Sequence, residues 1–250
     1  MSELQPGAVG FARAGDVYER ARPTYPDDAV AFLVERLDVG PQTTLVDLGA
    51  GTGKLTRLLV SSDAEVVAVE PLAGMWRQLV ASTPNARVVA GVAEAIPLAE
   101  ATVHAVTAGQ AFHWFRAPEA LAEIHRVLEP GGRLGLIWNV RDVAVPWVKR
   151  FGDILQPYEA DTPREWRKAW TPSFSSSELF TALEERSFLM GQELDAEGLV
   201  ERAASISFVA ALPDNERRPL LEEIRRLAST LPERFILPYR TTVYWCSRRS

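Results

Sequence analysis

The feature that most constrains the fold is a glycine-rich turn that follows a short apolar run, in the segment Val46-Asp47-Leu48-Gly49-Ala50-Gly51-Thr52-Gly53. Glycine is needed there because the backbone takes dihedral angles that other residues avoid, and because a ligand can then touch bare backbone. Glu70 ends the next apolar run, 21 positions after Gly49. A carboxylate at this place accepts hydrogen bonds from the ribose hydroxyls of an adenosine. The segment therefore predicts an open α/β sheet with a nucleoside site at the carboxyl ends of its strands.

The rest of the chain alternates short apolar runs with helical patterns. Because near-continuous runs of this kind, separated by helices, are typical of a parallel sheet covered on both faces, we predict a doubly wound α/β fold. The predicted strands are Thr44 to Leu48, Glu65 to Val69, Arg87 to Ala90, Val103 to Ala108, Arg133 to Trp138, Arg186 to Leu194 and Thr241 to Trp245. The clearest predicted helices are one that Gly40-Pro41 ends, Leu72 to Ala81, Pro118 to Leu128 and one through Leu220, Ile224, Leu227 and Leu231.

A chain of 250 residues with 47% hydrophobic composition can bury one full core. We predict a single domain, 1–250, in which 1–142 hold the N-terminal segment and the cofactor-binding core. Residues 143–185 are predicted to form a helical insertion or lid, and 186–250 to complete the sheet. The insertion contains Trp147, Trp166 and Trp170, which are expected to pack within it rather than to contact substrate.

Charge and composition exclude several classes of partner. The net charge of −6 leaves no basic surface for nucleic acid, and no apolar run approaches the roughly 20 residues that span a bilayer. The lone Cys246 and the absence of a signal-peptide pattern in Met1 to Gly7 indicate a cytoplasmic protein. The three histidines lack the spacing of metal ligands, so no metal site is predicted.

Two cofactors use a layout of this kind. A nicotinamide dinucleotide favours G-x-G-x-x-G, with its pyrophosphate at the helix N-terminus, but here Lys54 occupies the position of the third glycine and Gly53 comes one residue early. S-adenosylmethionine (SAM) carries no phosphate and needs instead room for its methionine chain and acceptors for its amino group. A tight turn without any ligand is the remaining interpretation, which the strand, turn, helix and spaced acid together argue against.

The sequence resembles the class I SAM-dependent methyltransferases, and within them the methyltransferase-11-like branch that acts on small molecules. The likeness is clearest over residues 10 to 140, and the closing Tyr239 to Trp245 is similar to the family's final antiparallel strand. It implies a mostly parallel seven-stranded sheet with a helical insertion after the fifth strand. Four segments carry it, namely Val46 to Gly53 with its D-x-G-x-G-x-G form, Val69-Glu70-Pro71, Ala93-Glu94 before Ile96-Pro97, and His125 to Gly132.

The resemblance also implies roles for the residues at the matching positions, all of them toward SAM. Those implied to contact its methionine and ribose parts are Asp47 at the amino group, Gly49, Ala50, Gly51, Thr52, Gln110 and Ala111, with Glu70 on the ribose hydroxyls. Those implied to surround the adenine are Pro71, Met75, Ala93 and Glu94. The segment Tyr18 to Pro26 resembles an N-terminal motif that folds over the cofactor in this branch.

Methyl transfer is an in-line displacement, and a general base is needed only where the acceptor arrives protonated. His113 follows the fourth strand and is the candidate base, because an imidazole suits proton transfer near neutrality. The alternative is that His113 packs among aromatic residues and orients the loop. Trp114 and Trp138 are candidates for the wall of an apolar substrate pocket, or else belong to the core.

Tyr18 and Arg22 are candidates to grip the carboxylate of SAM or of a substrate, since a guanidinium makes forked bonds to carboxylates. For Arg22 the alternative is a helix cap or a surface ion pair.

Three functions remain open at this point. They are a small-molecule methyltransferase, a SAM-binding protein without turnover, and, least favoured, a dinucleotide oxidoreductase. We favour methyl transfer to oxygen, while the acceptor molecule and the oligomeric state stay open because the fold alone does not determine them.

Overall fold

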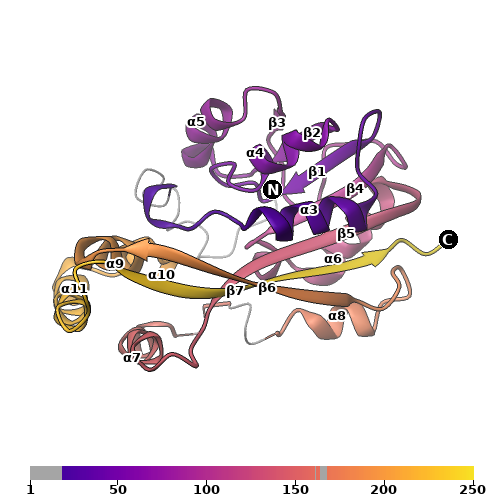
Figure 1. Cartoon of the computed structure of the whole chain (residues 1–250). Coiled ribbons are helices and arrows are strands. Elements are labelled where there is room, and N and C mark those ends of the chain that lie inside the picture. The colour runs from indigo at the N-terminus through magenta and orange to yellow at the C-terminus, as the bar shows by residue number, and fades with distance from the viewer. Residues whose placement is uncertain (1–18, 161, 164–167) are drawn as a thin grey trace.

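The computed structural model describes residues 19–160, 162–163 and 168–250, and its strands form one sheet (Figure 1). In chain order the strands are β1 (Thr44–Leu48), β2 (Glu65–Val69), β3 (Arg87–Val89), β4 (Val103–Gly109), β5 (Leu128–Arg141), β6 (Glu184–Leu194) and β7 (Phe235–Ser247). They lie in the order β3-β2-β1-β4-β5-β7-β6. Neighbouring strands from β3 to β5 are parallel, whereas β7 is antiparallel to both β5 and β6. The predicted mostly parallel sheet with an antiparallel final strand is confirmed.

Helices connect most of the strands, as expected of a doubly wound fold. They are α3 (Asp27–Leu37), α4 (Thr56–Leu59), α5 (Ala73–Ser82), α6 (Ala117–Val127), α7 (Pro146–Leu155), α8 (Thr171–Ser175), α9 (Ala196–Ala204), α10 (Ser207–Ala211) and α11 (Asp214–Ala228). Short 3₁₀ turns are η2 (Val60–Ser62), η3 (Phe112–Trp114) and η4 (Gln156–Tyr158). The helix predicted after the glycine turn is thus a single turn, α4, continued by η2.

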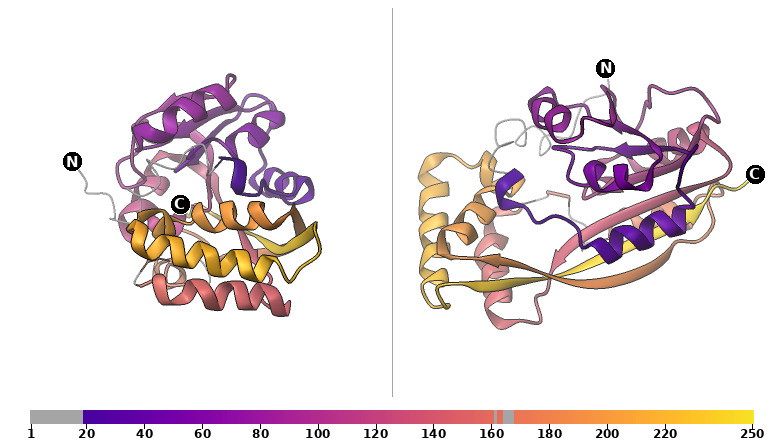
Figure 2. Two further views of the ribbon diagram at one scale, coloured as in Figure 1. Left: turned by 90° about the vertical axis from the view of Figure 1, so that its left-hand side faces the viewer. Right: turned by 45° about the horizontal axis from the view of Figure 1, so that its top comes forward.

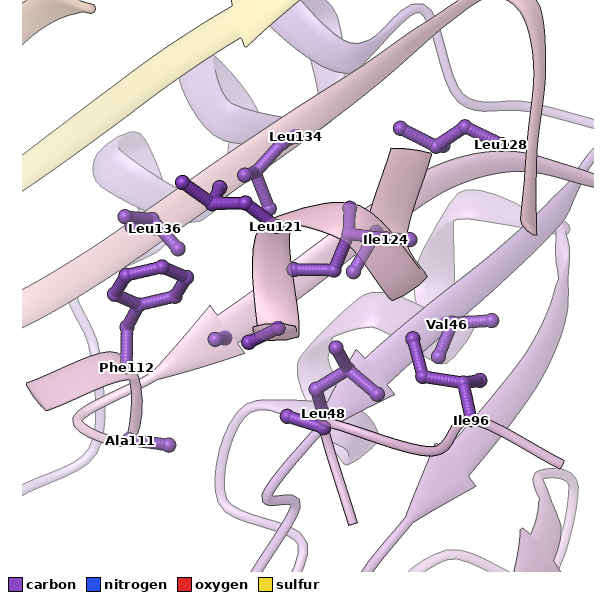
Figure 3. Packing of buried hydrophobic residues seen from close by; sticks show 14 of the residues in the cluster. Val46, Leu48, Ile96, Ala111, Phe112, Leu121, Ile124, Leu128, Leu134 and Leu136 are labelled. Atoms are coloured by element: carbon purple, nitrogen blue, oxygen red, sulfur yellow. The ribbon is translucent and has the colours of Figure 1, made fainter. Parts of the chain in front are cut away.

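Residues of alternate strand positions point to opposite faces of the sheet, so each face has its own core. Leu45 and Ala105 pack with α3 and α4 on one face. On the other face, Val46 and Leu48 pack with α6 and α8, and the facing side chains of α6 and β5 meet in Figure 3. Both faces are therefore covered, which explains the uninterrupted apolar runs of the sequence.

Strands β5 and β7 are much longer than predicted, and each has a physical reason. Leu128 already pairs with Val103, and the chain then bulges at 129–132 before Arg133 pairs with Ala105, so β5 begins five residues before the predicted Arg133. The predicted strand Thr241 to Trp245 is only the last part of β7, which begins at Phe235 and pairs along its whole length with β6. An internal proline, Pro238, hides the first part of β7 from sequence analysis.

Four helices gather at one end of the molecule, around the projecting ends of β6 and β7 (Figure 1). We call α7, α9, α10 and α11 the cap. Its core joins Phe151 of α7, Leu199 of α9 and Ile224 of α11 to Tyr239 of β7, and its long helices lie side by side in the end view of Figure 2. The cap therefore combines part of the predicted insertion, 143–185, with part of the predicted C-terminal region, 186–250.

The remainder of the insertion joins the sheet instead of the cap. Trp170 and Phe174 of the α8 region are buried against the same face as α6. Trp147 packs on Phe235 in the cap, with ring centroids 5.3 Å apart, and Trp166 lies outside the described residues. The two described tryptophans of the insertion are thus packing residues, but they pack on rings of the sheet, Phe235 of β7 and Trp138 of β5, and not only within the insertion.

Candidate functional site

The glycine turn lies at the carboxyl end of β1 and is tied to the end of β2. The amide groups of Gly49 and Ala50 donate to the carbonyl oxygen of Val69, at 2.8 and 3.2 Å. Gly49 and Gly51 have φ angles of +67° and +59°, which residues with a Cβ atom rarely adopt. A Cβ on Gly49 would lie 2.9 Å from the Cβ of Ala111, whereas one on Gly51 would meet no atom within 4 Å. The turn thus presents bare backbone to open space at Gly51.

Glu70 lies beside this turn and is nearly fully buried. Its two carboxylate oxygens accept hydrogen bonds from the amide groups of Gly51 and Leu72, each at 2.8 Å. The indole of Trp76 donates to its carbonyl oxygen at 3.0 Å. Burial raises the pKa of Glu70, and the two amide hydrogen bonds oppose this shift. Since a carboxylate offers about four lone-pair positions, acceptor capacity remains for a further donor.

Asp47 is completely enclosed beneath the turn. Its carboxylate accepts hydrogen bonds from the hydroxyl groups of Thr56, at 2.7 Å, and Thr107, at 3.2 Å. Burial raises its pKa from 3.8 to about 7, against the effect of these hydroxyls, and the nearby charge of Glu70 adds to the increase. The folded protein therefore holds Asp47 partly protonated near neutral pH.

This shift predicts a pH dependence of stability. Because the pKa of Asp47 is higher in the folded protein than in the unfolded chain, the unfolded chain releases this proton first, between pH 3.8 and about 7. The contribution of Asp47 to the free energy of unfolding should therefore fall as pH rises through this window and level off above it. Asp47→Asn lacks this titration. When pH rises from 5 to 7.5, the free energy of unfolding of the variant should therefore increase by at least about 1 kcal/mol relative to that of the wild type. Urea unfolding at several pH values measures this, and parallel stability curves for the two proteins would contradict it.

A cavity opens above the turn and extends to the cap. Of the residues predicted to bind SAM, those that line it are Arg22, Asp47, Gly49, Ala50, Gly51, Thr52 and Gln110. The other lining residues are Pro23, Tyr25, Lys54, Leu55, Gly109, Asn139, Arg202 and Tyr239. The cavity thus joins the glycine turn of the core to a helix of the cap.

The end of β4 brings Gln110 to the cavity, whereas Ala111, also predicted to contact SAM, is buried in the core and is not a lining residue. Gln110 has a φ angle of +57°, a strained value for a residue with a side chain, and such strain concentrates at functional sites. Its amide group donates to the carbonyl oxygen of Ile137 at 2.9 Å, and its side chain to that of Asn139 at 3.4 Å. These bonds hold the strained conformation beside the turn.

The residues predicted to surround an adenine lie apart from this cavity. Met75 and Ala93 are buried, and Pro71 is partly exposed at the end of β2. The carboxylate of Glu94 accepts a hydrogen bond from the backbone amide of Arg116 at 2.8 Å, at the start of α6. Glu94 therefore has a structural partner, and the adenine roles of all four residues stay predictions.

The N-terminal segment bridges the turn and the cap. The carboxylate of Glu19 accepts a hydrogen bond from the Thr52 hydroxyl at 2.5 Å. Arg22 donates to the hydroxyl and the carbonyl oxygen of Ser205, at 3.1 and 2.9 Å, and so caps the end of α9. This contact agrees with the helix-capping alternative for Arg22, while its side chain also lines the cavity, so its grip on a carboxylate stays a prediction. Tyr18 lies outside the described residues.

The aromatic candidates lie behind the cavity rather than in its lining. Trp138 is fully buried and stacks on Trp170 with ring centroids 4.8 Å apart. Its indole donates to Nδ1 of His113 at 3.2 Å. Trp138 thus belongs to the core, the second of its two predicted places, while Trp114 is partly exposed on η3. The other histidines bind elsewhere, His104 to Glu129 and His125 to the carbonyl oxygen of Arg249.

Sequence analysis missed several cavity residues. Lys54 and Tyr25 could have been found, since one follows the turn directly and the other lies in the N-terminal motif. Arg202 and Tyr239 carried no local signal, because an arginine in an amphipathic helix usually lies on a solvated face. Their place in the site depends on the cap, which brings α9 and β7 to the turn.

Two further searches of the described residues gave no candidates. In the ranges that the structure describes, no group of three or more His, Cys, Asp or Glu residues is placed to hold a metal ion. In the same ranges, no helix has the length and apolar character needed to cross a bilayer.

Comparison with known proteins places this site in a family. A protein-family model described as a methyltransferase domain matches residues 46–136. An uncharacterized methyltransferase-like protein of Schizosaccharomyces pombe is 37% identical over 216 residues, which are 86% of this chain and 84% of the relative. A malonyl-[acyl-carrier protein] O-methyltransferase of Methylococcus capsulatus is 43% identical over 133 residues, 50% of this chain and 48% of that protein. A solved structure from Anaeromyxobacter dehalogenans, assigned to the type II methyltransferases, has a TM-score of 0.65 and 26% identity, covering 91% of this chain and 96% of that one.

Proposed function

Because the chain belongs to the class I SAM-dependent methyltransferases, we propose that it transfers the methyl group of SAM to an oxygen atom of a small molecule. The observation that carries this proposal is the cavity that joins the glycine turn to the cap, since it gives a small acceptor a place beside the cofactor residues. The name of the Methylococcus relative, an O-methyltransferase, supports oxygen, although the match covers half of each chain.

The residues at the turn fit SAM. Gly51 faces open space with bare backbone, Asp47 places a carboxylate in the cavity lining for an ammonium group, and Glu70 keeps acceptor capacity for ribose hydroxyls. When bound, SAM supplies a methyl group on a positively charged sulfur whose leaving group is a neutral thioether. The chain's own residues then have to hold the acceptor in line and exclude water.

Incubation with labelled SAM and a panel of small molecules tests this function. Transfer of label to the oxygen of one compound is the expected result. Label lost only to slow hydrolysis across the whole panel would favour a SAM-binding protein without turnover. Label found on nitrogen, carbon or sulfur would overturn the choice of oxygen.

We propose that His113 orients the loop after β4 and is not a general base. Its Nδ1 accepts the indole hydrogen of Trp138 at 3.2 Å, which places the proton of the neutral ring on Nε2. The lone pair of this tautomer is therefore already used. An acceptor oxygen that arrives ionised requires no base.

His113→Ala should accordingly lower kcat by less than about tenfold, well short of the hundredfold or more that loss of a general base causes. The pH dependence of kcat should stay unchanged, as pre-steady-state and pH-profile measurements would show. A hundredfold loss together with an altered pH profile would restore the base role. An equal loss of SAM affinity and turnover would make His113 a cofactor contact.

A further inference from the structure

Arg202 is a buried cation for which the described part of the chain supplies no counter-ion. It lies on α9 with 6% of its surface exposed. Its Nε donates to the hydroxyl group of Tyr239 at 2.9 Å, but one terminal nitrogen is buried and has no hydrogen-bond acceptor. Across the described ranges, no carboxylate forms an ion pair with it. A guanidinium stays charged in proteins, and a buried charge is unfavourable unless a partner compensates it.

Its position is fixed by a chain of hydrogen bonds. The hydroxyl of Tyr239 donates to the side-chain oxygen of Gln192 at 3.2 Å, and the Gln192 amide donates to the carbonyl oxygen of Ala21 at 3.0 Å. Strands β6 and β7 and the N-terminal segment therefore hold Arg202 from one side. A preorganised guanidinium of this kind loses less freedom when it binds a ligand.

The cavity that Arg202 lines is rich in positive charge. Arg22 and Lys54 line it too, against one carboxylate, Asp47. Lys54 pairs with Glu19 at 3.4 Å, and Arg22 is bonded to Ser205. Among these lining cations, Arg202 is the one with a buried terminal nitrogen from which no described residue accepts a hydrogen bond, in a chain whose net charge is −6.

We propose that Arg202 binds a carboxylate group of the methyl acceptor, so that the substrates of this enzyme are small carboxylic acids. The inference rests on the proposed function. A carboxylate supplies two oxygens for the forked donors of a guanidinium, and its negative charge would compensate the buried cation. Arg202 lines the cavity from α9 of the cap, whereas the residues that fit SAM line it from the glycine turn, so we assign Arg202 to the acceptor rather than to the cofactor.

The test is binding to the full chain saturated with S-adenosylhomocysteine. Calorimetric titrations with glutarate, citrate and benzoate are compared with titrations of the corresponding uncharged amides. We expect at least one acid to bind and its amide not to bind. In Arg202→Met the acid should bind at least about tenfold more weakly, as for a lost charged hydrogen bond, and Arg202→Lys should restore part of the affinity. Arg225→Met on the exposed face of α11 removes the same charge and should change nothing.

Each other outcome has a defined meaning. If no acid binds, or if acid and amide bind equally, the proposal is wrong. A tenfold loss of S-adenosylhomocysteine affinity in Arg202→Met, with acid binding retained, would assign Arg202 to the cofactor's own carboxylate and overturn it. Wild-type protein that fails to bind S-adenosylhomocysteine would refute the proposed function itself. If Arg202→Met does not fold, the comparison is made with Arg202→Lys, which keeps the charge but not the forked geometry.

Discussion

Replacing Trp138 with alanine should lower the free energy of unfolding by about 3–5 kcal/mol, the range for a large aromatic side chain lost from a packed core. Trp138 is fully buried and lies at the centre of an aromatic group, stacked on Trp170 and edge-on to Tyr244 at 5.7 Å. The substitution also removes the indole hydrogen that His113 accepts. Guanidinium chloride unfolding followed by circular dichroism measures the change.

Trp114→Ala is the matched control. It removes the same type of side chain, but from a partly exposed position on η3, after β4, instead of a buried position in β5. We expect a clearly smaller loss of stability there. Equal losses in the two variants would mean that the core position of Trp138 does not account for the effect.

Replacing Glu70 with alanine should weaken SAM binding by about 2 kcal/mol or more, roughly thirtyfold, because hydrogen bonds to a charged acceptor contribute this much. The carboxylate is predicted to accept the ribose hydroxyls. It also holds the amide groups of Gly51 and Leu72 at 2.8 Å, so its loss should loosen the turn as well. Calorimetry on the folded variant measures the affinity, and unchanged binding would exclude the ribose role.

Glu70→Gln separates the two contributions. The amide has nearly the same shape but keeps a single acceptor oxygen, so one of the two backbone amide groups loses its partner. An intermediate affinity is expected. If the glutamine variant binds as weakly as the alanine variant while its thermal stability is intact, SAM binding requires the charged carboxylate with both of its acceptor oxygens, and the shape of the side chain is not sufficient.

The sheet and the glycine turn could be predicted because local patterns encode them. β1 and β2 have the bounds that their apolar runs indicate, and Gly49 and Gly51 adopt the positive φ angles that a D-x-G-x-G turn implies. The predicted ends of helices and strands were less accurate. Helix α3 ends at Leu37 because Asp38 takes a left-handed conformation with φ 55°, before the Gly40 that the sequence indicated as the stop.

The cap and its contribution to the site could not be predicted in this way. Its core joins α7 to α9 and α11, which are separated along the chain by an edge strand and a segment that packs on the sheet. Contacts between residues so far apart along the chain leave no periodic pattern in the local sequence. Arg202 in particular differs from a surface arginine only through the burial that this tertiary packing imposes.

The prediction for His113 illustrates a different limit. Its type and its place after β4 suggested a base, and both observations are correct. The loop-orienting role that we propose for it depends on the partner at Nδ1, Trp138, 25 positions away. The protonation of a histidine depends on the group that its other nitrogen meets, and that group is visible only in the folded protein.

The short stretch from Glu19 to Arg22 is bonded at one end to the turn, through Thr52, and at the other to the cap, through Ser205. A ligand that displaces this stretch from either side must disturb its attachment to the other. Thermodynamic linkage then requires that a ligand bound beside the turn and a ligand bound beside the cap change each other's affinity by the same factor. Cooperative loading of two reactants would follow from a few residues of backbone, without any movement of the sheet.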